Sequence, residues 1–293
     1  MEQHYWWIFA LAQPIGFAGV SLISQHYKQP GTSMAMMRAS FVVLCLLPFM
    51  PFIELPTASE FFYATAVAAT LAFVADSLMM NSFAKFGAGA TSRLLPISPL
   101  VAFVIWAVMN PEIFTQMSNN PLIASGLVAS LVACAAAIGM LSKCDVSKSA
   151  FIYLLPVIAI YGVLDVANKM AQDNSGFWSG IVWYTFILAS GSVILGVSLN
   201  LKNKTFKATV TNKIMLKAGF LLSLCYLFAM IGRNISMVYT PNPAYTSIIA
   251  GATPLLIVVY HKIFKIEDKA NVKAGLLFAM SILLMIYLAT LLG

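Results

Sequence analysis

Six ionisable side chains interrupt stretches of sequence that are otherwise apolar. They are three arginines, one lysine and two aspartates: Arg38, Arg93, Arg233, Lys169, Asp76 and Asp165. A charge near the centre of a bilayer costs about 2.5–3.5 kcal/mol on insertion scales. We therefore expect these groups to pair with one another, to face water or to bind a charged solute, and not to face lipid.

Arg93 lies in the stretch GATSRLLPISPL, which also holds two prolines. Pro96 and Pro99 cannot donate a backbone hydrogen bond, so they free carbonyls on the preceding turn. Broken backbone is tolerated at membrane depth only where protein or a water-filled cavity satisfies it. We expect Arg93 to line a polar cavity, where it meets either the carboxylate or phosphate of a solute or the side chain of Asp76.

Asp165 and Lys169 are four residues apart, which predicts an i,i+4 ion pair on one helix face. Structural alternatives stay open: Lys169 snorkelling to the interface, Arg38 tying two helices together, and Arg233 anchoring a helix end. Polar residues on the same helices complete the predicted solute site. The full set is Arg93, Asp76, Ser92, Asn81, Asp165, Asn168, Tyr245, Ser247, Arg38, Arg233, Tyr161 and Gln13.

The composition identifies the setting of these residues. Of the 293 residues, 60% are hydrophobic and only 9% are charged, against about 25% charged in typical soluble domains. So few charges cannot cover a water-soluble surface, and we expect an all-α integral membrane protein. The net charge of +7 does not indicate a nucleic-acid partner, because no soluble basic face is available to bind one.

Ten segments are long and apolar enough to cross a bilayer, which takes about 20 residues. Turn-forming residues such as Gln29-Pro30-Gly31 and Asp173-Asn174-Ser175-Gly176 separate them. The weakest break is at Phe86-Gly87. The predicted spans are 5–26, 32–53, 61–85, 88–109, 121–141, 149–172, 176–199, 215–239, 243–264 and 271–292.

Positive charge alternates along the loops between these spans. The even-numbered loops carry no Lys or Arg, and the odd-numbered loops carry Lys28, Lys85, Lys143, Lys148, Lys202, Lys204, Lys207, Lys213, Lys217, Lys262, Lys265, Lys269 and Lys273. Positive loops mark the cytoplasmic side. The pattern predicts cytoplasmic odd loops and both termini outside, with the plasma (inner) membrane as the expected location.

The two halves of the chain, residues 1–145 and 146–293, carry matching features in the same order. Halves with an odd number of spans must insert in opposite orientations, so the sequence predicts a 5+5 inverted-topology repeat. The matching residues are Pro14 and Pro156, Pro99-Leu100 and Pro254-Leu255, and Gly126 and Gly275.

These features resemble the EamA-like branch of the drug/metabolite transporter superfamily. The resemblance rests on the ten short spans and on the hydroxyl-to-Pro-Leu pattern of the fourth and ninth spans (Thr91-Ser92 before Pro99-Leu100, Thr246-Ser247 before Pro254-Leu255). Arg38 in the second span and Glu267-Asp268 before Ala274-Gly275-Leu276 also fit.

The resemblance implies a cavity between the halves, lined by spans one to four and six to nine, with spans five and ten peripheral. It also implies alternating access. Family members are usually drawn with cytoplasmic termini, whereas the lysines here place both termini outside. Either the chain is inverted relative to that picture or the count of spans differs by one.

The expected function is secondary transport of a small polar metabolite by alternating access. Buried cations outnumber buried acids by four to two, and a guanidinium can hold a carboxylate with two parallel hydrogen bonds. We therefore expect an anionic or zwitterionic solute, such as an amino acid or organic acid. The alternative is an exporter of cationic or aromatic compounds that uses Asp76 and Asp165.

No nucleotide-binding motif appears, so a coupling proton or a counter-solute is the expected energy source, with no cofactor and a monomer or homodimer as the assembly. A membrane-embedded enzyme is a weaker interpretation. His4, His26 and His261 lie at span ends on different helices, without a hydrolase or metalloprotease motif. A channel without alternating access is the third hypothesis.

Overall fold

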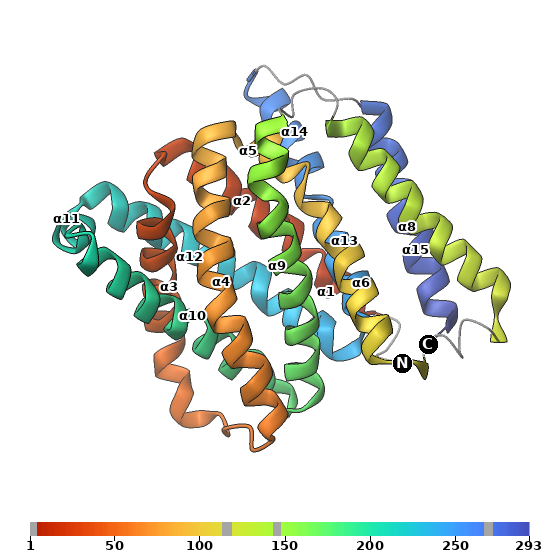
Figure 1. Ribbon diagram of the computed structural model, residues 1–293, viewed down its shortest axis with the longest axis horizontal. Coiled ribbons are helices and arrows are strands. Elements are labelled where there is room, and N and C mark those ends of the chain that lie inside the picture. Colours follow the sequence, from red (N-terminus) through yellow and green to blue (C-terminus); the bar gives the residue numbers. More distant parts are fainter. Residues whose placement is uncertain (1–4, 113–118, 143–147, 267–271, 293) are drawn as a thin grey trace.

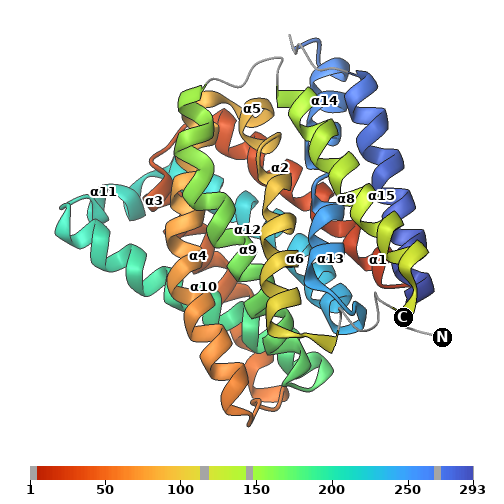
Figure 2. The same cartoon turned by 45° about the vertical axis from the view of Figure 1, so that its right-hand side comes forward.

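In the computed structural model, the chain forms a bundle of helices with one pair set to its side (Figures 1 and 2). The structure describes residues 5–112, 119–142, 148–266 and 272–292. Every regular element in these ranges is helical. The elements are α1 Trp6–Ala10, α2 Ala12–Tyr27, α3 Gly31–Leu46, η2 Leu47–Phe52, α4 Ser59–Phe86, α5 Ala88–Ser92, η3 Leu95–Ile97, α6 Ser98–Met109, α8 Pro121–Ser142, α9 Lys148–Asp173, α10 Phe177–Lys202, α11 Phe206–Thr211, α12 Lys213–Tyr239, α13 Pro243–Ala250, α14 Thr253–Ile263 and α15 Val272–Leu292.

Within the described ranges, eight helical stretches are long and apolar enough to cross a membrane. They correspond to predicted spans one to four and six to nine, so a multi-pass all-α membrane protein is confirmed. Their bounds are 6–27, 31–52, 59–86, 88–109, 149–173, 177–202, 213–239 and 243–263. The remaining two long helices, α8 and α15, pack along each other beside the bundle (Figures 1 and 2).

The first, third and seventh connections, which the structure describes in full, gather at one end of the bundle. The backbone N–H of Ala88 donates to the Gln25 side chain at 2.7 Å, which joins the start of α5 to the end of α2. Ser33 donates to the Asn200 side chain at 2.9 Å, which joins the start of α3 to the end of α10. We call this end of the molecule the odd end.

The even-numbered connections meet at the opposite end. Trp106, near the end of α6, donates from its indole nitrogen to the Pro241 carbonyl at 3.2 Å. Trp183, near the start of α10, donates to the Ile53 carbonyl at 3.1 Å. We call this the even end. The grouping agrees with the alternation of lysines along the sequence, while the assignment of the odd end to the cytoplasm stays a prediction.

The fourth and ninth spans are both broken in the middle. The fourth consists of α5, the 3-10 turn η3 and α6, and Pro99 lies in the first turn of α6. The ninth consists of α13 and α14, and Pro254 lies in the first turn of α14. Proline lacks the N–H that a continuous helix would use, so the helix restarts at each proline. The break predicted from Pro96 and Pro99 is confirmed.

The weakest predicted boundary, at Phe86-Gly87, is also confirmed. Gly87 has φ +87°, a left-handed conformation that glycine adopts without steric cost. It separates the end of α4 from the start of α5. The chain therefore reverses direction between two long apolar helices with almost no loop.

Small residues bring α2 close to α12. A Cβ added to Gly16 would collide with the backbone carbonyl of Cys225 and the side chain of Ala229. Membrane helices pack closely through such residues because lipid supplies no hydrophobic force between them. This contact brings the first span of one half against the third span of the other, beside the central cavity.

Candidate functional site

A cavity of about 110 Å³, measured as the space open to the centres of water molecules, lies at the centre of the bundle. It can hold several waters, because one water needs about 10–15 Å³ on this measure. Its described wall takes residues from α2, α3, α4, the α5–η3–α6 span, α9, α10, α12 and the α13–α14 span. None of the described wall residues comes from α8 or α15. The helices α8 and α15, which overlap predicted spans five and ten, thus stay outside the described wall.

One arginine–aspartate pair in the wall belongs to the first half of the chain. Arg38 on α3 donates from Nη2 to the carboxylate of Asp76 on α4. The other carboxylate oxygen of Asp76 accepts from the hydroxyl of Tyr161 at 2.8 Å. The Arg38 guanidinium lies 4.0 Å from the centre of the Tyr226 ring, close enough for a cation–π contact. Two tyrosines from the second half therefore hold the pair.

A second pair belongs to the second half. Arg233 on α12 donates from Nη2 to the carboxylate of Asp165 on α9. Its other terminal nitrogen donates to the Met230 sulfur at 4.0 Å, and sulfur is a weak acceptor. Both pairs are deeply buried, with exposed fractions of 2% and 4% for Arg38 and Asp76 and of 8% and 4% for Arg233 and Asp165.

The described wall of the cavity is therefore balanced in formal charge, with two arginines and two aspartates. The sequence suggested an excess of cations because it also counted Arg93 and Lys169, which are buried but are not among the described residues of the wall. Paired charges of this kind cost less to bury than single ones, because each supplies the other with the hydrogen bonds that water would have given.

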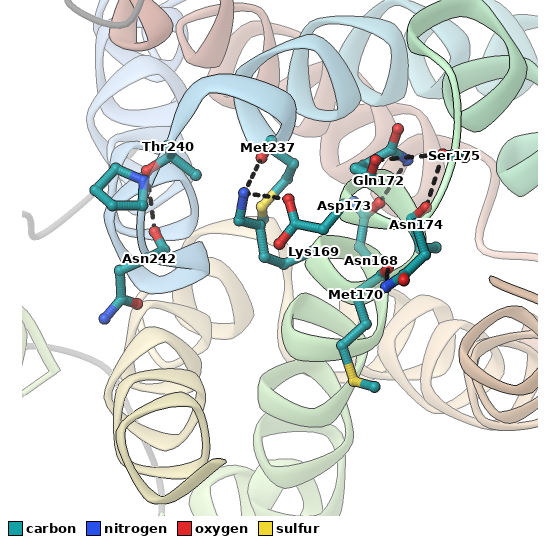
Figure 3. A network of polar contacts seen from close by, with 12 residues as sticks. Asn168, Lys169, Met170, Gln172, Asp173, Asn174, Ser175, Met237, Thr240 and Asn242 are labelled. Carbon is teal, nitrogen blue, oxygen red and sulfur yellow. Dashed lines mark hydrogen bonds and ion pairs between the residues drawn. The ribbon is translucent and has the colours of Figure 1, made fainter. Parts of the chain in front are cut away.

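The predicted pair of Asp165 with Lys169 is wrong. Lys169 donates instead to Asp173, four residues further along α9, at 2.6 Å. It also donates to the backbone carbonyl of Met237 on α12 at 3.0 Å (Figure 3). Asp165 turns to Arg233 on the neighbouring helix. The i,i+4 rule allowed both partners for Lys169, and the free carbonyls at the end of α12 favoured the one nearer the even end.

The expectation that Arg93 lines the cavity is also wrong. Arg93 is 1% exposed and is absent from the described wall, although its neighbour Ser92 and the following Leu95 and Pro96 belong to it. The broken helix does line the cavity, as the prolines indicated.

The other predicted residues divide into two groups. Those in the cavity wall are Gln13, Arg38, Asp76, Ser92, Tyr161, Asp165, Arg233 and Ser247. Gln13 also donates to the Thr246 carbonyl at 3.1 Å, which ties α2 to α13. Asn81, Asn168 and Tyr245 lie outside the described wall. Asn81 accepts from the Gly31 N–H, Asn168 donates to Asn234, and Tyr245 packs against Trp6.

Five polar residues of the described wall lie outside the predicted set: Ser21, Ser98, Tyr184, Tyr226 and Thr253. Helical spacing carried a signal for Tyr226. It lies four and seven residues before Met230 and Arg233, a spacing that places all three on one face of α12. Among the described residues, no group of three or more His, Cys, Asp or Glu side chains could hold a metal ion.

No protein-family model matches the chain, and no curated protein matches it.

Proposed function

We propose that the protein is a secondary transporter that carries a small zwitterionic or anionic metabolite across the membrane by alternating access. The observation that carries this proposal is the composition of the cavity wall. Each half of the chain contributes one arginine–aspartate pair to a single central cavity. Binding sites near the bilayer midplane, between two halves, are typical of secondary transporters.

We further propose that α8 and α15 are the fifth and tenth spans of a 5+5 inverted repeat. Three observations support this assignment: each half has a broken fourth span with a proline at its restart, one ion pair in the cavity, and a fifth helix that stays out of the wall. Alternating movement in the two halves would then expose the cavity at either end in turn. Membership of the EamA-like branch of the drug/metabolite transporters agrees with these features.

The balance of charge supports a zwitterion over a simple anion. A carboxylate that displaces Asp76 from Arg38 leaves an aspartate without its partner, and an uncompensated buried charge is costly. A solute with both a carboxylate and an ammonium group can replace both partners and keep the cavity neutral. The alternative of a cationic substrate on Asp76 and Asp165 is less favoured, because arginines already occupy both carboxylates.

Counterflow in proteoliposomes tests the proposal. Vesicles loaded with an unlabelled amino acid or organic acid are diluted into the labelled compound, across a panel that includes cationic and aromatic amines. We expect saturable uptake that internal zwitterion or anion accelerates. A Lys262→Gln variant, which changes an exposed residue far from the cavity wall, serves as the matched control. Uptake that rises linearly with concentration and ignores the internal solute would instead indicate a channel.

A further inference from the structure

A row of buried polar residues runs along α9 from the cavity to the even end. Asp165, Asn168, Lys169 and Gln172 follow a spacing of three, four and seven residues, which places them on one face of the helix. All four are buried. The Asp165 end lies in the cavity wall and the Gln172 end lies next to the even end. Such a stripe is unusual for a helix in a membrane, where polar groups are expensive.

A row of residues on α12, formed by Arg233, Asn234 and Met237, supplies partners for three of these side chains. Asp165 pairs with Arg233, Asn168 donates to the Asn234 side chain at 3.0 Å, and Lys169 donates to the Met237 carbonyl. The two helices run in the same direction here, because the partners advance together along both. Figure 3 shows the outer part of this contact, with Lys169 between Asp173 and Met237. We call the contact the even seam.

The even seam reaches a third helix through Asn234. Its side-chain nitrogen donates to the Thr185 hydroxyl at 2.9 Å and to the Ile181 carbonyl at 3.2 Å, both on α10. Gln172 donates back to Asn168 at 3.1 Å. The bonds join α9, α10 and α12 into one polar layer between the cavity and the even end. These three helices all belong to the second half of the chain.

The first half has its own seam, which runs to the other end. From the Arg38–Asp76 pair in the cavity, α3 and α4 continue toward the odd end, where the Asn81 side chain accepts from the Gly31 N–H at 2.7 Å. Near it, Gln25 of α2 accepts from the Ala88 N–H. Both acceptors satisfy the first N–H of a helix, which otherwise has no partner within the helix. We call this the odd seam.

Each seam therefore begins at an ion pair in the cavity and ends at one face of the protein. A buried polar bond holds two helices in one arrangement, because breaking it without a substitute leaves unsatisfied groups. The ion pair is the one link of each seam that a solute in the cavity can reach. A solute group that takes the place of one partner would loosen that link and leave the rest of the seam free to part.

We propose that the two seams are the gates of the transporter, and that each ion pair controls the gate of its own half. The Arg233–Asp165 pair holds the even gate closed and the Arg38–Asp76 pair holds the odd gate closed. This inference rests on the proposed transport function. The even gate is the firmer of the two, because its bonds connect three helices in one network, whereas the bonds of the odd seam join two separate helix pairs, α3–α4 and α2–α5.

Hydrogen exchange measured by mass spectrometry tests this assignment without any substrate. The proteins compared are wild type, Asp165→Asn and Asp76→Asn, each in lipid nanodiscs. In Asp165→Asn we expect backbone amides of residues 165–176 and 232–244 to exchange about tenfold faster or more, with residues 27–35 and 80–90 unchanged. Asp76→Asn reverses the pattern. Acceleration at both ends in either variant, or at neither end, would overturn the proposal.

Neutral substitutions in the outer seams provide the matched controls. Asn168→Ser loosens the even seam and Asn81→Ser the odd seam without touching an ion pair, and each is expected to accelerate exchange at its own end only. If an Asp→Asn variant does not purify as a folded protein, the variants Arg233→Lys and Arg38→Lys are measured in place of Asp165→Asn and Asp76→Asn. Lysine keeps the positive charge and loses the guanidinium fork. Counterflow reports separately on transport, so failure of the gates and failure of the function are distinguishable.

Discussion

The two arginine–aspartate pairs of the cavity share their chemistry and differ in their support. Asp76 accepts from Arg38 and from Tyr161, and Arg38 stacks on Tyr226. Arg233 has Asp165 and the weak acceptor Met230, and the described residues place no aromatic ring over its guanidinium. The Arg38 pair is held by tyrosines of the opposite half. The Arg233 pair is held by the polar row that continues along its own two helices.

This difference indicates how charge can be kept in a membrane cavity. A guanidinium that stacks on a ring retains part of its stabilisation when its carboxylate partner leaves. A guanidinium without a ring depends on the carboxylate alone. The Arg38 pair is therefore the better place for a solute carboxylate to replace an aspartate, and the Arg233 pair is the more sensitive one to mutation.

Removal of a carboxylate gives the largest expected effect. Breaking a buried pair by deleting one partner costs about 3–5 kcal/mol. We expect Asp165→Ala to fall in this range and Asp76→Ala to cost less, because Tyr226 still faces Arg38. The thermal midpoint of purified protein, followed by fluorescence-detected size exclusion, gives the order. Equal losses, or a larger loss for Asp76→Ala, would contradict the comparison.

Tyr161→Phe comes next. It removes the hydroxyl that donates to Asp76 at 2.8 Å, and a hydrogen bond to a charged group contributes about 1.5–3 kcal/mol. Tyr184→Phe is the control, because Tyr184 also lines the cavity and the described residues offer its hydroxyl no hydrogen-bond partner. We expect a lower thermal midpoint for Tyr161→Phe alone. A similar drop in both variants would show that the Asp76 contact contributes nothing specific.

The smallest effect is expected at Tyr226. Tyr226→Phe keeps the ring over Arg38, whereas Tyr226→Leu removes it and loses a cation–π contact that contributes about 2 kcal/mol when desolvated. We predict a lower thermal midpoint for the leucine variant only. In an Asp76→Ala background, where the ring is the main remaining partner of Arg38, the difference between phenylalanine and leucine should grow. If it disappears there, the ring does not support the arginine.

Much of the fold was accessible from sequence because membrane spans impose simple rules. Length, apolar content and turn residues located the eight spans that the structure confirms, and Gly87, Pro99 and Pro254 marked their breaks. The described cavity wall takes residues from these same eight spans. Burial of Asp76, Asp165, Arg38 and Arg233 followed from their cost in lipid.

The pairing of these residues could not be read from the chain. Helical spacing relates residues on one helix, so it suggested Lys169 for Asp165, while the true partner lies on α12, 68 residues away. The sequence also did not show that Arg93 stays out of the described cavity wall while Ser92 and Leu95 belong to it. Contacts between polar residues of different helices depend on how each helix is rotated about its axis and on the depth of each residue in the bundle. Close packing of the kind seen between Gly16 and Cys225 sets both.

The central claim is that the arginine–aspartate pairs of the cavity bind a small zwitterionic or anionic solute. A thermal-shift screen against zwitterions, anions and cations tests it most directly, on wild type and on a double variant, Arg38→Met with Asp76→Leu. Replacing a buried pair by apolar residues is often neutral or stabilising, so this variant should stay folded. We predict that a zwitterion or anion raises the melting temperature of wild type and leaves that of the variant unchanged. At a ligand concentration of 100 times Kd, the free energy of unfolding of wild type should rise by about 2.7 kcal/mol. An equal shift in both proteins, or stabilisation by cations alone, would contradict the account.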